Sequence, residues 1–453
     1  METLRRCLPP SIRRTLEELP ESLDETYERV LREIKKPNRD LAYRLLQCLV
    51  VAIRPLRVEE LAEVLAVDFD DGEGTAKLNP SWRWEDHEQA LLSSCSSLIS
   101  IVENVAVDSD GHSDVGARDN NEIQNDASLV VQFSHFSVKE FLTSPRLASP
   151  SRDVSHYHII LEAAHTIMAQ ACLGVLLQLD DAVEENVSGN SSPLARYAAR
   201  HWVSHAQFQN VSSHVKIAME CLFDPDKPYF VAWLGLYDMD YYRHPSPFYL
   251  FSQRTSAATP LYYASLCGFE DLVGRLIAKY PHQVKTDGGY YRTPALAALA
   301  TRHFELARLL HHNGASVDLP GVGMQTPLYS AAYYGDLEMV QVLLGYKADV
   351  HSRNELGSTP LIAASYRAHP QTLHVIRLLL EDGANPNVWA HDGTTPLHAA
   401  SGSGSLEVVR LLLEYGADVE SENNEGRTPF QVASRGGRDE VTKLLLDHGA
   451  RRV

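Results

Sequence analysis

The segment Thr395-Pro396-Leu397-His398-Ala399-Ala400 opens a pattern that decides the fold of the C-terminal half of this chain. It predicts a helix, because a threonine hydroxyl can cap the first turn and a proline at the next position loses no hydrogen bond there. Val409, Leu412 and Leu413 follow at three-to-four spacing and predict the buried face of a second helix. The small side chains of Ala399 and Ala400 allow that helix to pack closely, and Gly416 suits the left-handed residue that ends it.

Thr-Pro dipeptides repeat this opening through the second half of the chain. They begin at Thr259, Thr293, Thr326, Thr359, Thr395 and Thr428, at intervals of 34, 33, 33, 36 and 33 residues. Gly-Ala pairs end four of the units, at Gly314, Gly383, Gly416 and Gly449. A unit of this size cannot bury its own apolar face, so its neighbours must stack on it. We therefore expect an array of about six repeats over residues 254–453.

This pattern resembles the ankyrin repeat family, whose period is about 33 residues. The first two units depart from the family pattern, because Ala295-Leu296 follows Pro294 and Gly288-Gly289-Tyr290-Tyr291 replaces the usual Asp-x-x-Gly turn. The fourth unit carries three extra residues near 368–371, which we expect to lengthen the loop between its two helices. The resemblance implies an α-solenoid of stacked helix pairs that binds a protein partner.

The same resemblance implies where the partner binds, since partners of this family meet the projecting turns and the exposed end of each first helix. By position within the period we predict ten partner-binding residues: Tyr290, Arg292, Tyr333, Tyr334, Leu356, Tyr366, Arg367, His391, Asp392 and Arg435. We expect Tyr333, Tyr334, Tyr366 and Arg367 to form one patch, because tyrosine and arginine dominate interface energetics. The alternative for Tyr333 and Tyr334 is that their rings pack between units.

The first half of the chain contains no repeat. Its apolar spacing predicts helices over residues 23–34, 40–53, 58–66 and 138–142 and β-strands over 97–102 and 129–133. Helices followed by a hairpin suggest a small winged-helix-like domain over residues 1–150. Within it, the acidic segment 103–128 is predicted to be a solvated loop rather than an acidic docking motif. A helical linker or capping domain is expected over residues 151–253, giving a mainly α chain.

Three blocks of this half, at residues 22–31, 54–61 and 131–142, resemble the segment that follows the nucleotide-binding module in fungal NACHT–ankyrin proteins, relatives of NOD-like receptors. Residues 193–202 resemble the helical stretch that joins this segment to the repeats. A nucleotide switch needs a Gly-rich loop ending in Gly-Lys-Ser/Thr, and no Gly-Lys pair occurs in this chain. ATP hydrolysis is therefore not implied. Met1 falls about where the family's ATPase module finishes, which leaves a stand-alone partner and an incomplete gene model as alternatives.

Composition limits the function classes. A net charge of −18 argues against nucleic acid as a partner, because such binding depends on Lys and Arg neutralising phosphates. No apolar run reaches the 18 to 20 residues needed to span a bilayer, so no membrane role is expected. Six scattered cysteines and the absence of a secretory signal favour the cytoplasm, with the nucleus left open.

Histidines are the strongest candidates for chemistry. His201 and His205 lie four residues apart on a predicted helix, the spacing of a zinc pair, and His156, His158 and His165 form a looser group. No His-Glu-x-x-His motif accompanies them, so packing roles are predicted. We expect no catalytic, cofactor-binding or metal residue, and interpret the chain as a non-enzymatic protein-interaction scaffold, with no cofactor, that forms the sensor half of a NACHT-type system. The alternatives are a regulatory subunit or fragment that associates with a P-loop NTPase, and a metal-dependent hydrolase.

Overall fold

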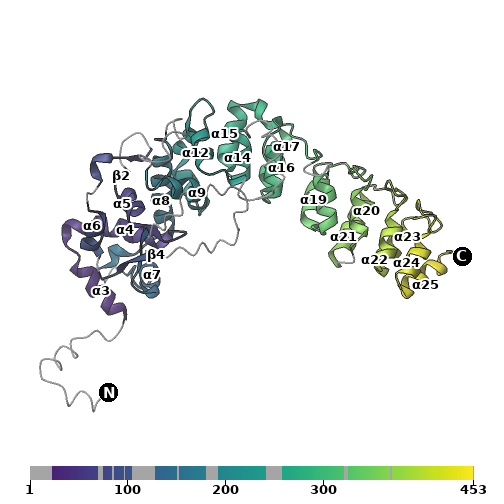
Figure 1. Ribbon diagram of the computed structural model, residues 1–453, viewed down its shortest axis with the longest axis horizontal. Helices are drawn as coiled ribbons and strands as arrows, with labels where there is room; N and C mark the ends of the chain where they lie inside the picture. The colour runs from purple at the N-terminus through teal and green to yellow at the C-terminus, as the bar shows by residue number, and fades with distance from the viewer. Residues whose placement is uncertain are drawn as a thin grey trace, which may run out of the picture. The chain divides into compact units, whose positions relative to one another are not determined.

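The computed structural model describes residues 23–69, 75–83, 86–95, 97–104, 128–149, 153–179, 192–240, 258–320, 325–367 and 370–451. The chain is mainly helical, and it divides into one compact unit up to Met239 and a second from Asp240 (Figure 1). The predicted fold class is confirmed: the second unit is a solenoid of helix pairs. Among the described residues, every helix falls short of the length and apolar character that a bilayer crossing requires.

The first part of unit 1 combines short helices with a small antiparallel sheet. Its helices are α3 (Leu23–Glu33), α4 (Arg39–Val51), α5 (Val58–Leu65), α6 (His87–Cys95) and α7 (Phe136–Thr143). Strands β1 (Leu56–Arg57), β5 (Ser128–Phe133) and β4 (Ile99–Asn104) form the sheet in that order, with Ile101 opposite Val131, and β2 (Val67–Asp68) pairs with β3 (Lys77–Leu78). The predicted helices and strands are confirmed to within about two residues at their ends. Residues 105–127, most of the predicted acidic loop, lie outside the described residues.

Two glutamates on α5 are buried, although their residue type predicts exposure. Glu60 accepts hydrogen bonds from the Arg57 backbone N–H and from the Arg54 guanidinium, with 2.6 Å between Arg54 Nη2 and Glu60 Oε1. Burial alone raises the pKa of Glu60, but these bonds outweigh it and leave the pKa below its ordinary value. Glu63 pairs with Arg83 and accepts from the Leu194 N–H at 2.8 Å. The two carboxylates therefore fix the ends of α5 to neighbouring segments.

The rest of unit 1 is helical. It contains α8 (Leu161–Leu176), α9 (Ala195–Ala206), α10 (Val211–His214), α11 (Lys216–Leu222) and α12 (Tyr229–Leu236). Trp202, Phe223 and Trp233 form its aromatic core, with ring centroids 5.5 to 6.0 Å apart. The Trp233 indole donates a hydrogen bond to the Ala199 carbonyl at 2.9 Å, which satisfies its buried N–H.

The described part of unit 2 contains six helix pairs. They are α14 and α15 (Pro260–Cys267, Glu270–Lys279), α16 and α17 (Pro294–Ala300, Phe304–His312), α18 and α19 (Pro327–Tyr334, Leu337–Gly345), α20 and α21 (Pro360–Ser365, Pro370–Glu381), α22 and α23 (Pro396–Ser403, Leu406–Glu414), and α24 and α25 (Pro429–Arg435, Asp439–Asp447). The helices of the first two pairs pack against each other, and so do those of the last four pairs, as Figure 1 shows for α20 to α25. Between the described residues of α16 and α17 and those of α18 and α19, no comparable helix packing is found. We number these pairs as repeats 1 to 6.

Each repeat begins as its sequence predicts. The threonine before each proline accepts a hydrogen bond from the backbone N–H three residues later, and the proline occupies the first turn. In repeat 5, Ala400, Val409 and Leu412 are fully buried, and Gly416 is left-handed with φ 85°. The irregular turn at 288–291 does not shift the helix that follows, because α16 still begins at Pro294. In repeat 4, residues 368–369 lie outside the described residues and α21 begins at Pro370.

Candidate partner-binding surface

The turns between repeats form short hairpins that are linked to one another. In repeats 4 and 5 they close through hydrogen bonds from Asn354 N to Ser358 O (3.1 Å) and from Ala390 N to Thr394 O (3.0 Å). The His391 N–H donates to the Leu356 carbonyl at 2.9 Å, and the Asp392 carbonyl accepts from the next hairpin. The three predicted turn residues Leu356, His391 and Asp392 therefore lie on one continuous row, and all are exposed.

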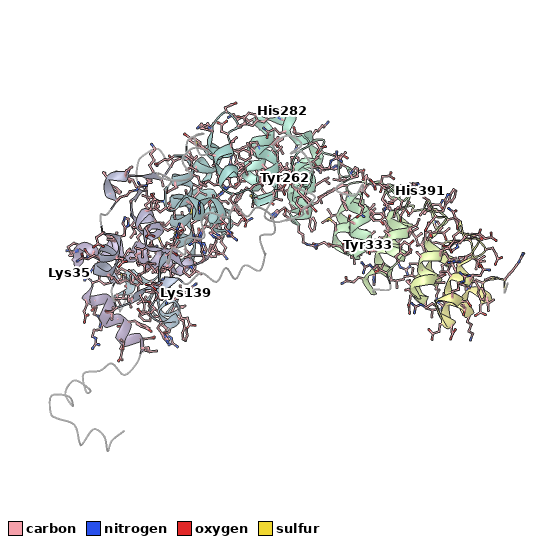
Figure 2. The ribbon with its side chains drawn as sticks, in the orientation of Figure 1. Lys35, Lys139, Tyr262, His282, Tyr333 and His391 are labelled. Atoms are coloured by element: carbon pink, nitrogen blue, oxygen red, sulfur yellow. The ribbon has the colours of Figure 1, made fainter. Side chains whose placement is uncertain are left out.

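His391 also helps to build this row. Gly357 has φ 72°, and a Cβ on it would lie 2.4 Å from the His391 ring. The ring therefore packs against the Gly357 backbone, at a contact that only glycine allows. His391 is nevertheless exposed on the hairpin row, where a partner can contact it (His391 is labelled in Figure 2).

The predicted patch at the ends of the first helices is joined by contacts. The Arg367 guanidinium carbon lies 4.3 Å from the Tyr333 ring centroid, a cation–π geometry between repeats 3 and 4. The Tyr334 ring lies edge-on to Tyr333 at 5.2 Å and is 76% exposed (Tyr333 is labelled in Figure 2). Tyr333 thus contributes to packing between repeats, as the alternative interpretation expected, whereas Tyr334 faces solvent.

Tyr366 is the fourth member of this patch. Burial raises the pKa of its hydroxyl, and a hydrogen bond with Thr394 of the next turn opposes that rise. Tyr366 is nevertheless 47% exposed. Tyr366 therefore connects the first-helix patch to the hairpin row.

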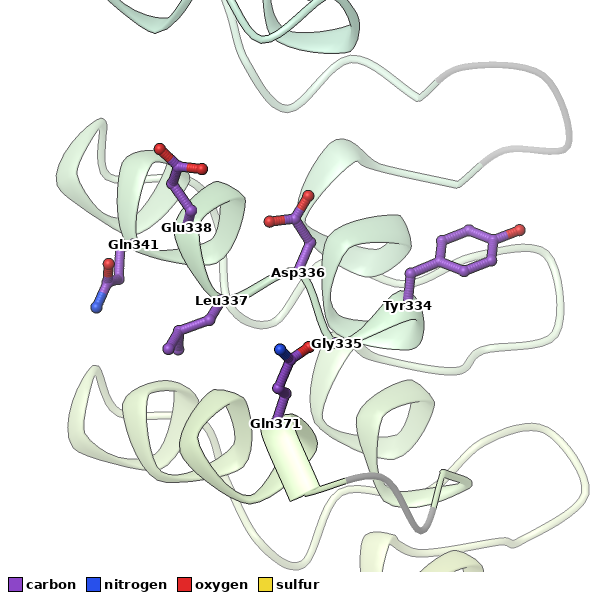
Figure 3. Close-up of a pocket in the computed structure, with 7 residues that line it drawn as sticks. All are labelled: Tyr334, Gly335, Asp336, Leu337, Glu338, Gln341 and Gln371. Carbon is purple, nitrogen blue, oxygen red and sulfur yellow. The ribbon is translucent and has the colours of Figure 1, made fainter.

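A shallow hollow of about 520 Å³ lies beside this patch, between repeats 3 and 4. Its lining residues are Tyr334, Gly335, Asp336, Leu337, Glu338, Gln341 and Gln371 (Figure 3). Asp336 and Glu338 both bind the guanidinium of Arg302 from repeat 2, and Asp336 also caps α19 by accepting from the Met339 N–H. These two carboxylates therefore join repeats 2 and 3 and also line the hollow.

The other predicted residues lie in different repeats. Arg292 binds the Asp287 carboxylate and donates to the Pro320 carbonyl at 2.7 Å, so its guanidinium links repeats 2 and 3. Tyr290 is half-buried, and its backbone N–H donates to Asp240 at 2.6 Å. Arg435 is exposed at the end of α24. The structure therefore groups Tyr333, Tyr334, Tyr366 and Arg367 with the hairpin row, and places Tyr290, Arg292 and Arg435 apart from them.

Trp389 is an exposed residue that the sequence analysis missed. It is 62% exposed, while its neighbours Val388 and Ala390 are buried with Ile362. This alternation leaves the indole outside. In the flanking repeats the corresponding position, six residues before the Thr-Pro threonine, holds the polar residues Arg353 and Glu422. A tryptophan at this position was therefore a sign in the sequence of a binding residue.

The histidines have structural partners. His398 Nε2 donates to the Arg427 carbonyl at 2.8 Å and so fastens repeat 5 to the next turn. His205 is fully buried, with Nδ1 3.0 Å from His165 Nδ1 and Nε2 3.0 Å from the Tyr197 hydroxyl. Within the described residues, no group of three or more His, Cys, Asp or Glu side chains is placed to hold a metal ion.

The comparison with protein families agrees with the geometry of unit 2. The family model described as ankyrin repeats (3 copies) matches residues 296–390, 328–423 and 372–452. Among curated proteins, the azaphilone pigments biosynthesis cluster protein L of Monascus ruber is 28% identical over 312 residues, which is 67% of this chain and 61% of that protein.

Shorter matches include two human proteins. Transient receptor potential cation channel subfamily A member 1 of Homo sapiens is 30% identical over 150 residues, covering 32% of this chain and 13% of the channel. Ankyrin repeat and SOCS box protein 16 of Homo sapiens is 35% identical over 112 residues, 24% of each chain. This chain spans less than two thirds of each of these three relatives. Together with the six capped helix pairs, the family match shows that the C-terminal part of this chain is built of ankyrin repeats.

Proposed function

We propose that unit 2 is a protein-binding platform whose contact surface is centred on Tyr333, Tyr334, Tyr366 and Arg367, here called the tyrosine–arginine patch. The observation that carries this proposal is the stacking of Arg367 on Tyr333 beside a solvent-exposed Tyr334. Side chains that are already ordered lose little conformational entropy when a partner binds. Tyrosine and arginine are also the residue types enriched at binding hot spots.

The hairpin row extends the same platform. Leu356, His391 and Asp392 are exposed on it, and Tyr366 of the patch lies beside Thr394 of the same row. Tyr290, Arg292 and Arg435 belong to the proposal as outlying positions in repeats 2 and 6. A partner that touched all ten residues would have to run along most of the array.

For the first half of the chain we propose a winged-helix-like domain over residues 1–150 and a helical domain over 151–253, ahead of the repeats from 254. Support comes from the order of elements, since α5 is followed by the β4–β5 hairpin and then α7. We further propose that this half belongs to the sensor half of a fungal NACHT-type signalling system in the cytoplasm; as the alternative, the chain is a regulatory subunit that associates with a P-loop NTPase. Stable copurification of the chain with such an NTPase tests this alternative, and its absence would contradict it.

The platform is tested by the double variant Tyr366→Ala/Arg367→Ala in the full chain. We expect partner capture, measured by affinity purification with crosslinking, to fall at least about tenfold, as expected when interface hot spots are removed. A matched control, Arg410→Ala/Tyr415→Ala, removes the same residue types from exposed positions at the second helix of repeat 5. Undiminished capture by the patch variant would contradict the proposal, and a lost cooperative melt would show that the patch is core.

A further inference from the structure

The hairpin edge of repeats 4 and 5 exposes large apolar side chains. Leu356 is 70% exposed and Trp389 is 62% exposed, on adjacent hairpins that are hydrogen-bonded through His391 N and Leu356 O. Burying two such side chains against a partner removes a large apolar area from water, and tryptophan is enriched at binding hot spots. We call this surface, defined by Leu356 and Trp389, the apolar hairpin edge.

Buried neighbours and hydrogen bonds fix the backbone that carries these exposed side chains. Val388 and Ala390 anchor the segment on both sides of Trp389 by packing with Ile362. Arg353 Nη1 donates to the Trp389 carbonyl at 2.8 Å and to the Gly357 carbonyl at 3.1 Å, so one guanidinium ties the two hairpins together. The edge is therefore preorganised for binding.

The charge beside this edge is acidic. Residues 353–358, 389–394 and 422–427 of the three hairpins carry four acidic and two basic residues, which is a net charge of −2. Glu425 pairs with Arg427, and Glu420 lies 3.9 Å from Arg451. In the described part of the chain, Asp392 and Glu422 have no cationic partner within ion-pair distance. A partner at this edge therefore meets uncompensated negative charge next to exposed apolar surface.

We propose that the apolar hairpin edge binds a peptide segment that combines a large apolar side chain with a lysine or arginine. The apolar side chain lies on Leu356 and Trp389, and the cation lies near Asp392 and Glu422. Leu356 and Asp392 occupy the same position in consecutive repeats, as do Trp389 and Glu422, so each apolar residue is one repeat away from an acidic one. Packed helices are about 8 to 10 Å apart, which an extended chain crosses in about three residues, so the peptide needs that spacing between its two side chains. The inference rests on the proposed function, because it names the kind of partner that the platform takes.

The test measures fluorescence anisotropy of short labelled peptides with the full chain. Four peptides of equal length carry tryptophan and lysine three residues apart, tryptophan and glutamate, tryptophan and serine, or serine and lysine. We expect the tryptophan–lysine peptide to bind about tenfold or more tighter than the other three, and its affinity to fall with salt. Equal binding of the tryptophan–glutamate peptide, or no binding by any peptide, would overturn the inference.

Variants locate the binding. Trp389→Ala should weaken the tryptophan–lysine peptide at least about tenfold, whereas Trp82→Ala, which removes a half-exposed tryptophan from unit 1, should not. Asp392→Asn/Glu422→Gln should reduce the salt dependence, while Glu407→Gln/Glu414→Gln makes the same charge change on α23 and should not. Unchanged peptide binding by Trp389→Ala would refute the site. If the cellular partner still binds Trp389→Ala but not Tyr366→Ala/Arg367→Ala, this inference fails and the platform stands.

Discussion

At the scale of single residues, Lys347 occupies a position that four of the other repeats give to glycine. It ends the second helix of repeat 3 with φ 63°, where Gly314, Gly383, Gly416 and Gly449 stand in other repeats. A left-handed residue with a Cβ costs about 1–2 kcal/mol, and glycine returns part of that through its larger unfolded-state entropy. Lys347→Gly should therefore raise the free energy of unfolding of the array by about 0.5–1 kcal/mol, measured by urea denaturation.

The reverse change is the control for this prediction. A Cβ on Gly383 would meet no atom within 4 Å, so Gly383→Lys introduces only the backbone penalty. It should destabilise the array by a similar amount. A Lys347→Gly variant that is no more stable than the parent would show that Lys347 makes a compensating interaction.

His205 in unit 1 predicts a pH dependence. Burial lowers its pKa to about 3, helped by the neighbouring charges of His165 and His201. The folded pKa lies below the unfolded value of about 6.5. The stability that the neutral, buried imidazole contributes is therefore fully present above about pH 6.5 and is lost as the pH falls toward 3. The slope contributed by one such group is at most about 1.4 kcal/mol per pH unit.

Replacing the imidazole by an amide, His205→Gln, should flatten that slope. His165, whose own pKa is lowered by burial and by Lys139, should retain part of it. The readout is tryptophan fluorescence during urea unfolding at several pH values, because Trp202 and Trp233 report on unit 1. A variant with the parental slope would assign the acid sensitivity to other groups.

At the scale of elements, the Thr-Pro start of each first helix is the local signal that proved most reliable. Thr359 is buried and its hydroxyl accepts from the Ile362 N–H. Thr359→Ala should lower the free energy of unfolding by about 1 kcal/mol through loss of this cap. Thr359→Ser keeps a hydroxyl and should recover most of the loss in thermal melts; equal losses for both variants would point to packing of the methyl group instead.

Elements that depend on distant partners were harder to predict. The capped helices of unit 2 follow from residues within one turn, so each begins at its predicted proline. By contrast, β1 has only two residues, and it exists because Leu56 and Arg57 pair with Val131 and Val130. The burial of Glu60 and Glu63 likewise follows only from their partners Arg54, Arg83 and Leu194, which the sequence around α5 does not reveal. Such contacts span loops that no periodicity describes.

At the scale of the whole molecule, the repeat register explains how much of the candidate site could be predicted. Position within the period places Tyr334 and Leu356 on exposed sites, as expected. It does not show that Arg367 crosses to Tyr333 of the previous repeat, because that contact depends on how adjacent repeats are offset. Trp389 was missed because partner-binding positions were taken from the family resemblance. Comparing the residue types at one position across the repeats would have found it, since the other repeats beside it hold polar residues there.

Stacking also predicts how damage spreads along the array. In a chain of nearest-neighbour units, a central repeat supports two interfaces and a terminal repeat only one. Leu379 in α21 and Leu445 in α25 are both fully buried, so each leucine-to-alanine change should cost about 2–5 kcal/mol locally. Leu379→Ala should lower hydrogen-exchange protection in repeats 3, 4 and 5, whereas Leu445→Ala should release repeat 6 and leave repeats 3 and 4 protected. Equal spreading from both variants would mean that unit 2 unfolds as one globular core, and the interface would then have to be sought on a surface not built by stacking.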